Sequence, residues 1–259
     1  MGAICLAETN LNWHYYQHSA ALRRCLHRNW SSSKFQTSVP DEQLLGNYQP
    51  GGTATIVTDR WTSRVITTGS DPHGLGRWSY VILRGTSDIN ICIVTAYRVC
   101  NDKYTGPKTA YQQQKWHLAA IFCQNKVSVT ADPFKQFILD LQSWIASVQV
   151  NGTQIILCLD NNEEFLPNKG QLVTLPASTT PLLHKTHDGS LDTLACSMGL
   201  VDVFRHHHPS PCYPATYNRG CKCINLILVS ASLLPAIKPS GIFPYNSCSK
   251  ETTVLVTLI

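Results

Sequence analysis

The sequence predicts a sandwich of β-sheets and α-helices, of the α/β or α+β class, on three observations. Segments rich in β-branched residues follow one another between residues 53 and 99, which is typical of antiparallel hairpins. Two segments with helical patterning then occupy residues 110–125 and 132–148, and further strand-like runs come after them. Strands, a pair of helices and more strands in this order are typical of layered sheets covered by helices.

The composition indicates a globular protein, which we interpret as a single domain over residues 1–259. Apolar residues make up 43% of the chain and charged residues 14%, which excludes an intrinsically disordered chain. No linker, internal repeat or low-complexity segment is visible in the sequence. The formal net charge of +5 is compatible with a polyanionic partner but does not specify one.

The cysteines and the first residues indicate in which cellular compartment the protein is expected. The opening MGAICLAETN has neither a basic stretch nor a long apolar stretch, so no signal peptide is expected. Eleven cysteines, an odd number with irregular spacing, are then expected to be free thiols. The longest apolar run, residues 224–237, is too short to span a bilayer. We expect an intracellular protein, cytoplasmic or nuclear and not secreted, without a membrane segment; no protein partner can be inferred.

The first half of the chain is expected to combine one helix with several strands. Residues 3–10 form a short apolar run with polar residues at its end, which predicts a strand. Residues 11–30 show near-helical spacing and contain neither glycine nor proline, which predicts a helix. Further strands are expected at 53–58, 77–86 and 88–99.

The second half is expected to begin with two helices. Asp132 is the predicted N-cap of the second helix and Pro133 its first residue. Ser190 or Asp188 is expected to cap a later short helix that ends at Gly199. The remaining expected strands are residues 153–164, 200–204, 223–230 and 252–259.

Polar residues recur where the predicted strands end. Taken singly, each has an ordinary interpretation: Glu8 as a solvated acid, Asp160 and Asn162 as turn residues, and Tyr97 as a core aromatic. Taken together they are more informative, because functional sites gather where strand ends meet loops. The motifs, in chain order, are LAETN, TAYRV, LDNNE and PATYNRG.

This ordered series resembles the endonuclease/exonuclease/phosphatase superfamily, especially the apurinic-type endonuclease domains of non-LTR retrotransposons and related reverse-transcriptase-linked proteins. The resemblance runs through nearly the whole chain and implies a four-layer α/β sandwich of two mixed sheets flanked by helices. It also implies hydrolysis of a DNA phosphodiester assisted by Mg²⁺ or Mn²⁺, in which the metal polarises the phosphoryl oxygens. Each motif alone is weak, but their order across the chain is fairly specific.

The resemblance also implies a role for each motif residue. Glu8 is expected to bind the metal. Tyr97 is expected to face the phosphate with its hydroxyl, and Arg98 beside it to contact phosphate or nucleic acid. Asp160 and Asn162 are expected to take the roles of base and phosphate-orienting amide. Neutral donors around the phosphate would stabilise the charge that develops during hydrolysis.

The sequence departs from the family pattern near its end. Asn225, Lys250 and Glu251 stand where the family has Asp, Asp and His, and Cys223 stands in place of Arg. Residues 209–259 contain no Asp and no His, so no shift of register restores the catalytic pair. Asparagine lacks the charge that stabilises an imidazolium, and Lys250 brings a cation that we expect to contact phosphate. The family's first strand, which ends in Asn, is also expected to be missing.

Three functions remain open on the sequence. The first is a retrotransposon-derived endonuclease with a degenerate and inactive site, which the departures favour. The second is a weakly active nuclease in which Glu251 and Glu8 hold the metal and Asp160 acts as the base. The third is a module that binds nucleic acid or phosphate without cleaving it, through Tyr97, Asn162 and the neighbouring cations.

A metal site unrelated to the family is a fourth possibility. Three histidines and three cysteines lie between His206 and Cys223. Zinc sites favour cysteines separated by two to four residues, whereas Cys221 and Cys223 are separated by one, and adjacent histidines cannot all converge. We favour a surface loop followed by cysteines of a strand over a zinc site.

Overall fold

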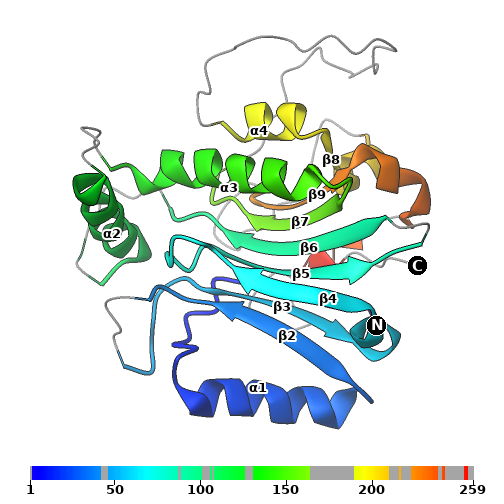
Figure 1. Ribbon diagram of the computed structural model, residues 1–259, viewed down its shortest axis with the longest axis horizontal. Coiled ribbons are helices and arrows are strands. Elements are labelled where there is room, and N and C mark those ends of the chain that lie inside the picture. The colour runs from blue at the N-terminus through cyan, green and yellow to red at the C-terminus, as the bar shows by residue number, and fades with distance from the viewer. Residues whose placement is uncertain are drawn as a thin grey trace.

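Two β-sheets lie against one another between layers of helices in the computed structural model of the chain (Figure 1). The structure describes residues 2–41, 46–86, 89–100, 106, 108–125, 131–163, 190–209, 216, 223–238, 241–242 and 254–255. The expected fold class, two sheets flanked by helices, is confirmed.

The first sheet has three antiparallel strands. Strands β1 (Ala3–Ala7), β2 (Ser33–Ser38) and β3 (Thr53–Thr58) pair in the order β1-β3-β2. Strand β3 is buried at every position, because its two faces are covered by a helix and by the second sheet. The helix is α1 (Tyr16–Asn29), which begins later than the predicted residue 11.

The second sheet has six strands and is mixed. Its strands are β4 (Val65–Ser70), β5 (Trp78–Arg84), β6 (Asn90–Tyr97), β7 (Gln154–Asp160), β8 (Leu200–Asp202) and β9 (Asn225–Ser230). They pair in the order β4-β5-β6-β7-β9-β8, and β6 and β7 are the parallel pair. Parallel neighbours need a long crossover. The crossover here contains α2 (Ala110–Gln124) and α3 (Pro133–Gln149).

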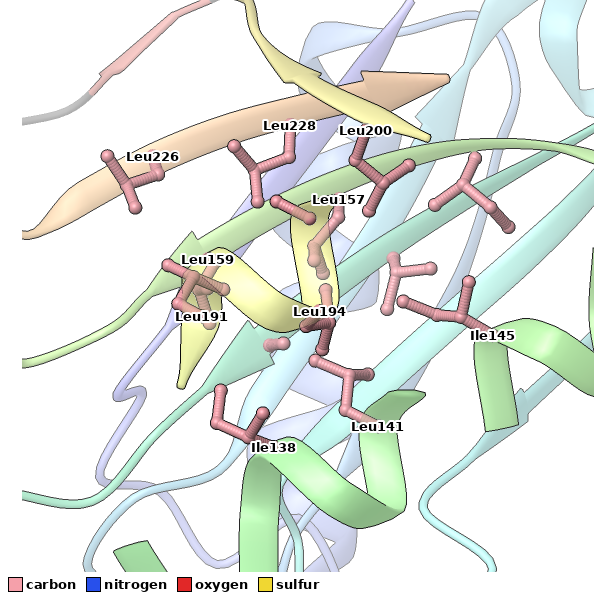
Figure 2. Close-up of a cluster of buried hydrophobic side chains, with 14 of the residues drawn as sticks. Ile138, Leu141, Ile145, Leu157, Leu159, Leu191, Leu194, Leu200, Leu226 and Leu228 are labelled. Atoms are coloured by element: carbon pink, nitrogen blue, oxygen red, sulfur yellow. The ribbon is translucent and has the colours of Figure 1, made fainter. Parts of the chain in front are cut away.

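Helix α3 packs on the outer face of the second sheet, as its sequence pattern predicts. Asp132 caps it by accepting hydrogen bonds from the amides of Phe134 and Lys135, and Pro133 is its first residue. Helix α4 (Leu191–Ser197), capped by Ser190, lies beside it. Figure 2 shows side chains of both helices meeting leucines of the sheet. The labelled residues are Ile138, Leu141, Ile145, Leu157, Leu159, Leu191, Leu194, Leu200, Leu226 and Leu228.

The space between the two sheets is apolar at one end and lined by hydroxyl groups toward the other. Val57, Ile93 and Ile227 belong to the apolar part. In the polar part, the hydroxyl of Thr55 on β3 lies 2.8 Å from that of Thr95 on β6. Thr53 and Ser79 make a similar contact at 3.0 Å between β3 and β5. These contacts couple the two sheets, because buried hydroxyl groups need partners of defined geometry.

The predicted strand at 200–204 is shorter than expected. The side chain of Asp202 accepts hydrogen bonds from the amides of Phe204 and Arg205, at 2.9 and 3.2 Å, and so starts helix α5 (Val203–His207). The prediction of a strand through residue 204 is therefore wrong, because an N-cap interaction competes with strand pairing.

The remaining described elements are short. They are the 3₁₀ turns η1 (Asp59–Arg64) and η2 (Ala231–Ala236) and the antiparallel strands β10 (Gly241–Ile242) and β11 (Val254–Leu255). Most of the predicted strand at 252–259 lies outside the described residues. Among the helices that the structure describes, none has the length and apolar character needed to cross a membrane.

Candidate active site

Several strand ends of the two sheets meet at one rim of the sandwich. In the second sheet Tyr97 pairs with Asp160 across β6 and β7, and Asp160 pairs with Asn225 across β7 and β9. Residues in register on neighbouring strands lie about 5 Å apart and point to the same face. Three of the residues expected at the site are therefore neighbours on adjacent strands, although they come from distant parts of the chain.

The side chain of Tyr97 lies at the centre of this rim. It is 4% exposed, and its ring packs beside the backbone of Gly51, which precedes β3. Burial raises the pKa of Tyr97 above its ordinary value, and the nearby carboxylates of Glu8 and Asp160 raise it further. The phenol is therefore neutral over the whole physiological range and can donate a hydrogen bond. Strand register places Asp160 beside Tyr97, and Glu8 directly follows Ala7, which packs against the cluster that contains Tyr97.

Glu8 follows β1 in a loop held by backbone pairing. The amide of Thr9 donates to the carbonyl of Gly52 at 3.1 Å, and the amide of Asn10 to that of Gly51 at 2.8 Å. Glu8 and Asn10 have φ angles of 50° and 54°, in the left-handed region that is costly for residues other than glycine. Such strain persists only where the surroundings impose it, and it clusters at functional sites.

Replacing Gly51 with alanine tests how closely this loop fits Tyr97. Gly51 has φ +81°, and an added Cβ would lie 3.2 Å from the Cε1 atom of Tyr97. Gly152→Ala is the matched control, since Gly152 has φ +73° with nothing within 4 Å of the added Cβ. Both variants should lose about 1–2 kcal/mol of unfolding free energy from backbone strain. Gly51→Ala should lose about 1 kcal/mol more from overpacking, as measured by urea denaturation. Equal losses would show that the Tyr97 contact is loose.

A tight turn after β7 orients Asp160 and Asn162. The Oδ1 atom of Asp160 accepts a hydrogen bond from the amide of Asn162 at 3.2 Å, and Asn162 has a left-handed φ of 51°. The side-chain amide of Asn162 donates to the carbonyl of Arg98 at 2.7 Å, and its Oδ1 accepts from the thiol of Cys100 at 3.1 Å. The turn is thus fastened to the segment that follows β6.

The guanidinium of Arg98 points into this turn. The side chain is 2% exposed and stacks on the ring of Phe134 at 3.4 Å. It donates to the carbonyl of Phe134 at 3.0 Å and to Asn161 at 3.2 Å, and it pairs with Glu163 at 3.0 Å. Burial lowers the pKa of Arg98 to about 10, against the opposing effect of Glu163, so the group stays charged at neutral pH. This placement favours a positioning role over the phosphate contact expected from the sequence.

Asn225 is fixed by a residue to which we assigned no role from the sequence. The amide of Asn225 donates to the hydroxyl of Thr216 at 2.9 Å, and its side-chain amide donates to the carbonyl of Thr216 at 3.3 Å. Thr216 is buried and also accepts from the amide of Ile224. The signal was present, because Thr216 lies in the motif PATYNRG. Lys250 and Glu251 lie outside the described residues.

The chemical type of the donor groups at the rim indicates which metal ion they could bind. Glu8 and Asp160 are carboxylates, and Mg²⁺ commonly binds one or two carboxylates together with water and substrate phosphate. They fit Mg²⁺ or Mn²⁺ in the kind of donor they supply. Within the described part of the chain, no group of three or more His, Cys, Asp or Glu side chains could hold a metal ion. That search covered His206 and His207 of α5. Cys212 and Cys221 lie outside the described residues.

Solved structures with a similar fold include AP endonucleases, an exonuclease and a 3′ phosphatase. AP endonuclease LMAP from Leishmania major is 13% identical, with a TM-score of 0.60 over 97% of this chain and 76% of that one. The APE2 catalytic domain from Xenopus laevis is 14% identical, with a TM-score of 0.58 over 100% of this chain and 84% of that one. The 3′ phosphatase NExo from Neisseria, bound to product DNA hairpin, is 16% identical, with a TM-score of 0.56 over 100% and 89%.

These comparisons establish the fold. The chain shares the overall fold of these structures, a layered α/β sandwich of the kind that the resemblance of its sequence motifs implied. No protein-family model matches the sequence, and no curated protein matches it. At such low identity the likeness identifies the fold alone, and function has to be argued from the residues of the rim.

Proposed function

We propose that this chain derives from a metal-dependent DNA endonuclease of retroelement origin and that its hydrolytic step is impaired. The observation that carries the proposal is the pairing of Asp160 with Asn225 at the rim. A neutral amide stands beside Asp160 where the sequence motifs call for a second carboxylate. The fold supports the ancestry, since the similar structures include AP endonucleases and a phosphatase bound to a DNA hairpin.

The rim retains the means to hold a phosphodiester. The neutral hydroxyl of Tyr97 is a donor for a phosphoryl oxygen, and the Asp160 carboxylate, fixed by the Asn162 amide, can orient a water molecule. Glu8, with Asp160 nearby, would hold a divalent cation, which when bound supplies positive charge at the phosphoryl oxygens. Binding of the scissile group therefore requires the metal, because the carboxylates alone would repel a phosphate.

The step that is impaired is proton transfer. The side-chain amide of Asn225 donates to the carbonyl of Thr216, and an amide neither accepts a proton at neutral pH nor balances the charge of an imidazolium. Residues 209–259 offer no histidine for this step. Loss of a general acid–base partner typically lowers a rate on the order of 10²–10⁴-fold.

We expect that the purified chain with Mg²⁺ or Mn²⁺ nicks neither plasmid DNA nor an abasic duplex above background. Glu251→His alone should change little, because no carboxylate would orient the new imidazole. The triple variant Asn225→Asp, Lys250→Asp and Glu251→His should gain weak metal-dependent nicking, which Asp160→Ala should remove again. The measurement is conversion of supercoiled plasmid to open circles. Nicking by the unmodified chain that Asp160→Ala abolishes would contradict the proposal and favour an active site that uses Glu251.

Binding without cleavage is a second candidate function, which the neutral Tyr97 donor favours. Such binding at the rim should require Mg²⁺ and should weaken in Tyr97→Phe, which removes the hydroxyl and keeps the ring. Filter binding of an abasic duplex with Mg²⁺ and with EDTA measures it. The duplex is also tested in EDTA with the unmodified chain and with Arg60→Glu, Arg64→Glu, a variant without two exposed arginines far from the rim. If both chains bind the duplex equally well in EDTA, metal does not mediate binding at the rim.

A further inference from the structure

Exposed cations gather at the end of the sandwich opposite the rim. This end is formed by the last turns of α1, the start of β2, the end of β3, turn η1 and the end of β5. We call it the basic end; its exposed cations are Arg23, Arg24, Arg28, Lys34, Arg60, Arg64 and Arg84. Among the described residues of these segments, Asp59 is the one carboxylate, and it accepts a hydrogen bond from the hydroxyl of Ser31 at 3.1 Å.

The strand register separates this surface from the rim. Arg84 ends β5 opposite Asn90, where β6 begins, whereas Tyr97 ends β6 at the rim. A strand of this length spans roughly 25 Å at about 3.3 Å per residue. In Figure 1, α1 runs along β2 and β3 toward the side marked N, away from α2. A single phosphate group therefore cannot touch both surfaces.

Two of the cations are held on a fixed aromatic ring. The guanidinium groups of Arg60 and Arg64 lie 5.6 and 5.5 Å from the ring centroid of Trp61. Trp61 in turn packs on the apolar core between the sheets and beside the backbone of Gly2. Cation–π contacts of this kind restrict the two side chains before any ligand arrives, which reduces the entropy lost on binding.

The described residues at the rim include three carboxylates. Glu8, Asp160 and Glu163 lie there, Arg77 and Arg98 near it are buried and paired with carboxylates, and Lys108 and Lys135 are exposed cations near it. A polyanion that approaches without a metal is therefore attracted to the basic end.

We propose that the basic end is a second nucleic-acid-binding surface, which contacts the phosphodiester backbone without regard to sequence and without a metal ion. Arginine guanidinium groups suit this task, because their forked donors match phosphate oxygens. The exposed positions in the last two turns of α1 are small, polar or charged, which is unlike a helix that inserts into a lipid surface. The choice of nucleic acid among polyanions rests on the function proposed above.

The test is binding of a fluorescent DNA duplex in EDTA, measured by anisotropy over a range of salt concentrations. Each lost phosphate contact should lower the binding constant by a factor of [salt] to the power −0.9. The double variant Arg60→Glu, Arg64→Glu should therefore weaken binding roughly 60-fold at about 0.1 M salt. The slope of log K against log [salt] should fall by about 2. The matched control Lys108→Glu, Lys135→Glu changes the net charge equally at exposed positions near the start of α2 and α3. It should change affinity less than about threefold, because it removes no backbone contact at the basic end.

Three outcomes would overturn the proposal. Equal losses in the two double variants would mean that only net charge matters. Absence of binding by the unmodified chain in EDTA would mean that the basic end holds no DNA. Tighter binding to phosphatidylserine vesicles than to DNA, removed by the Arg60 and Arg64 substitutions, would identify a membrane surface as the ligand.

A second measurement keeps the proposal testable if the charge-reversed chain fails to fold. Phenylglyoxal modifies exposed arginines, and DNA should protect Arg60 and Arg64 of the unmodified chain, as read by mass spectrometry. The binding assay is run in EDTA and the nicking assay with Mg²⁺, so the two assays report on different surfaces. The nicking assay tests the proposed function, and the binding assay in EDTA tests the basic end. Either proposal can therefore fail while the other holds.

Discussion

Replacing Arg77 with alanine is expected to lower the free energy of unfolding by about 3–5 kcal/mol, because it leaves buried carboxylates without their cation. Arg77 is fully buried. Its Nε atom lies 2.6 Å from Asp71, and its Nη1 atom 2.6 Å from Asp140 on α3. Burial lowers the pKa of Arg77, but Asp71 and Asp140 outweigh that effect, so the pKa lies above its ordinary value.

The loss should extend to the rim. The carbonyl of Arg77 accepts a hydrogen bond from the amide of Tyr97 at 2.8 Å, so the segment that Arg77 anchors also holds the end of β6. Urea denaturation gives the free energy, and Arg64→Ala is a control in which an exposed arginine is removed and the midpoint should move little. A loss below about 1.5 kcal/mol for Arg77→Ala would show that water or rearrangement compensates the carboxylates.

Replacing Arg98 with alanine is expected to cost about 2–4 kcal/mol and to loosen the turn that carries Asp160 and Asn162. The substitution leaves the carbonyl of Phe134 and the side chain of Asn161 without their charged donor. Amide hydrogen exchange of residues 161–163 should accelerate beyond the change in global stability, which a purely global effect would not produce.

Two further variants separate charge from geometry at this position. Arg98→Lys keeps the positive charge but cannot reach the same three partners, so it should recover less than half of the loss. Glu163→Gln should have a small effect, because the Glu163 side chain is 58% exposed and its ion pair is screened by solvent. If Arg98→Ala left both stability and exchange unchanged, Arg98 would not position the turn, and a phosphate contact would again be the better hypothesis.

Local signals in the sequence were sufficient for most elements of the fold. Asp132 and Pro133 start α3 where predicted, since an N-cap and a first-turn proline act within one helical turn. The β-branched run at 53–58 forms β3 with the same bounds. The strand predicted through residue 204 was wrong because Asp202 is both compatible with a strand and a strong N-cap, and only its hydrogen bonds to Phe204 and Arg205 decide between them.

The sequence by itself determined which polar residues stand at strand ends, because hydrophobic runs and the residues that stop them are local. Only the tertiary structure decided which of these ends meet and which way their side chains point. Tyr97, Asp160 and Asn225 become neighbours through pairing between β6, β7 and β9. Arg98, the residue after Tyr97, points inward because its guanidinium stacks on the ring of Phe134 and pairs with Glu163. Burial and ion pairing of this kind depend on segments far apart in the chain, which no local pattern of residues encodes.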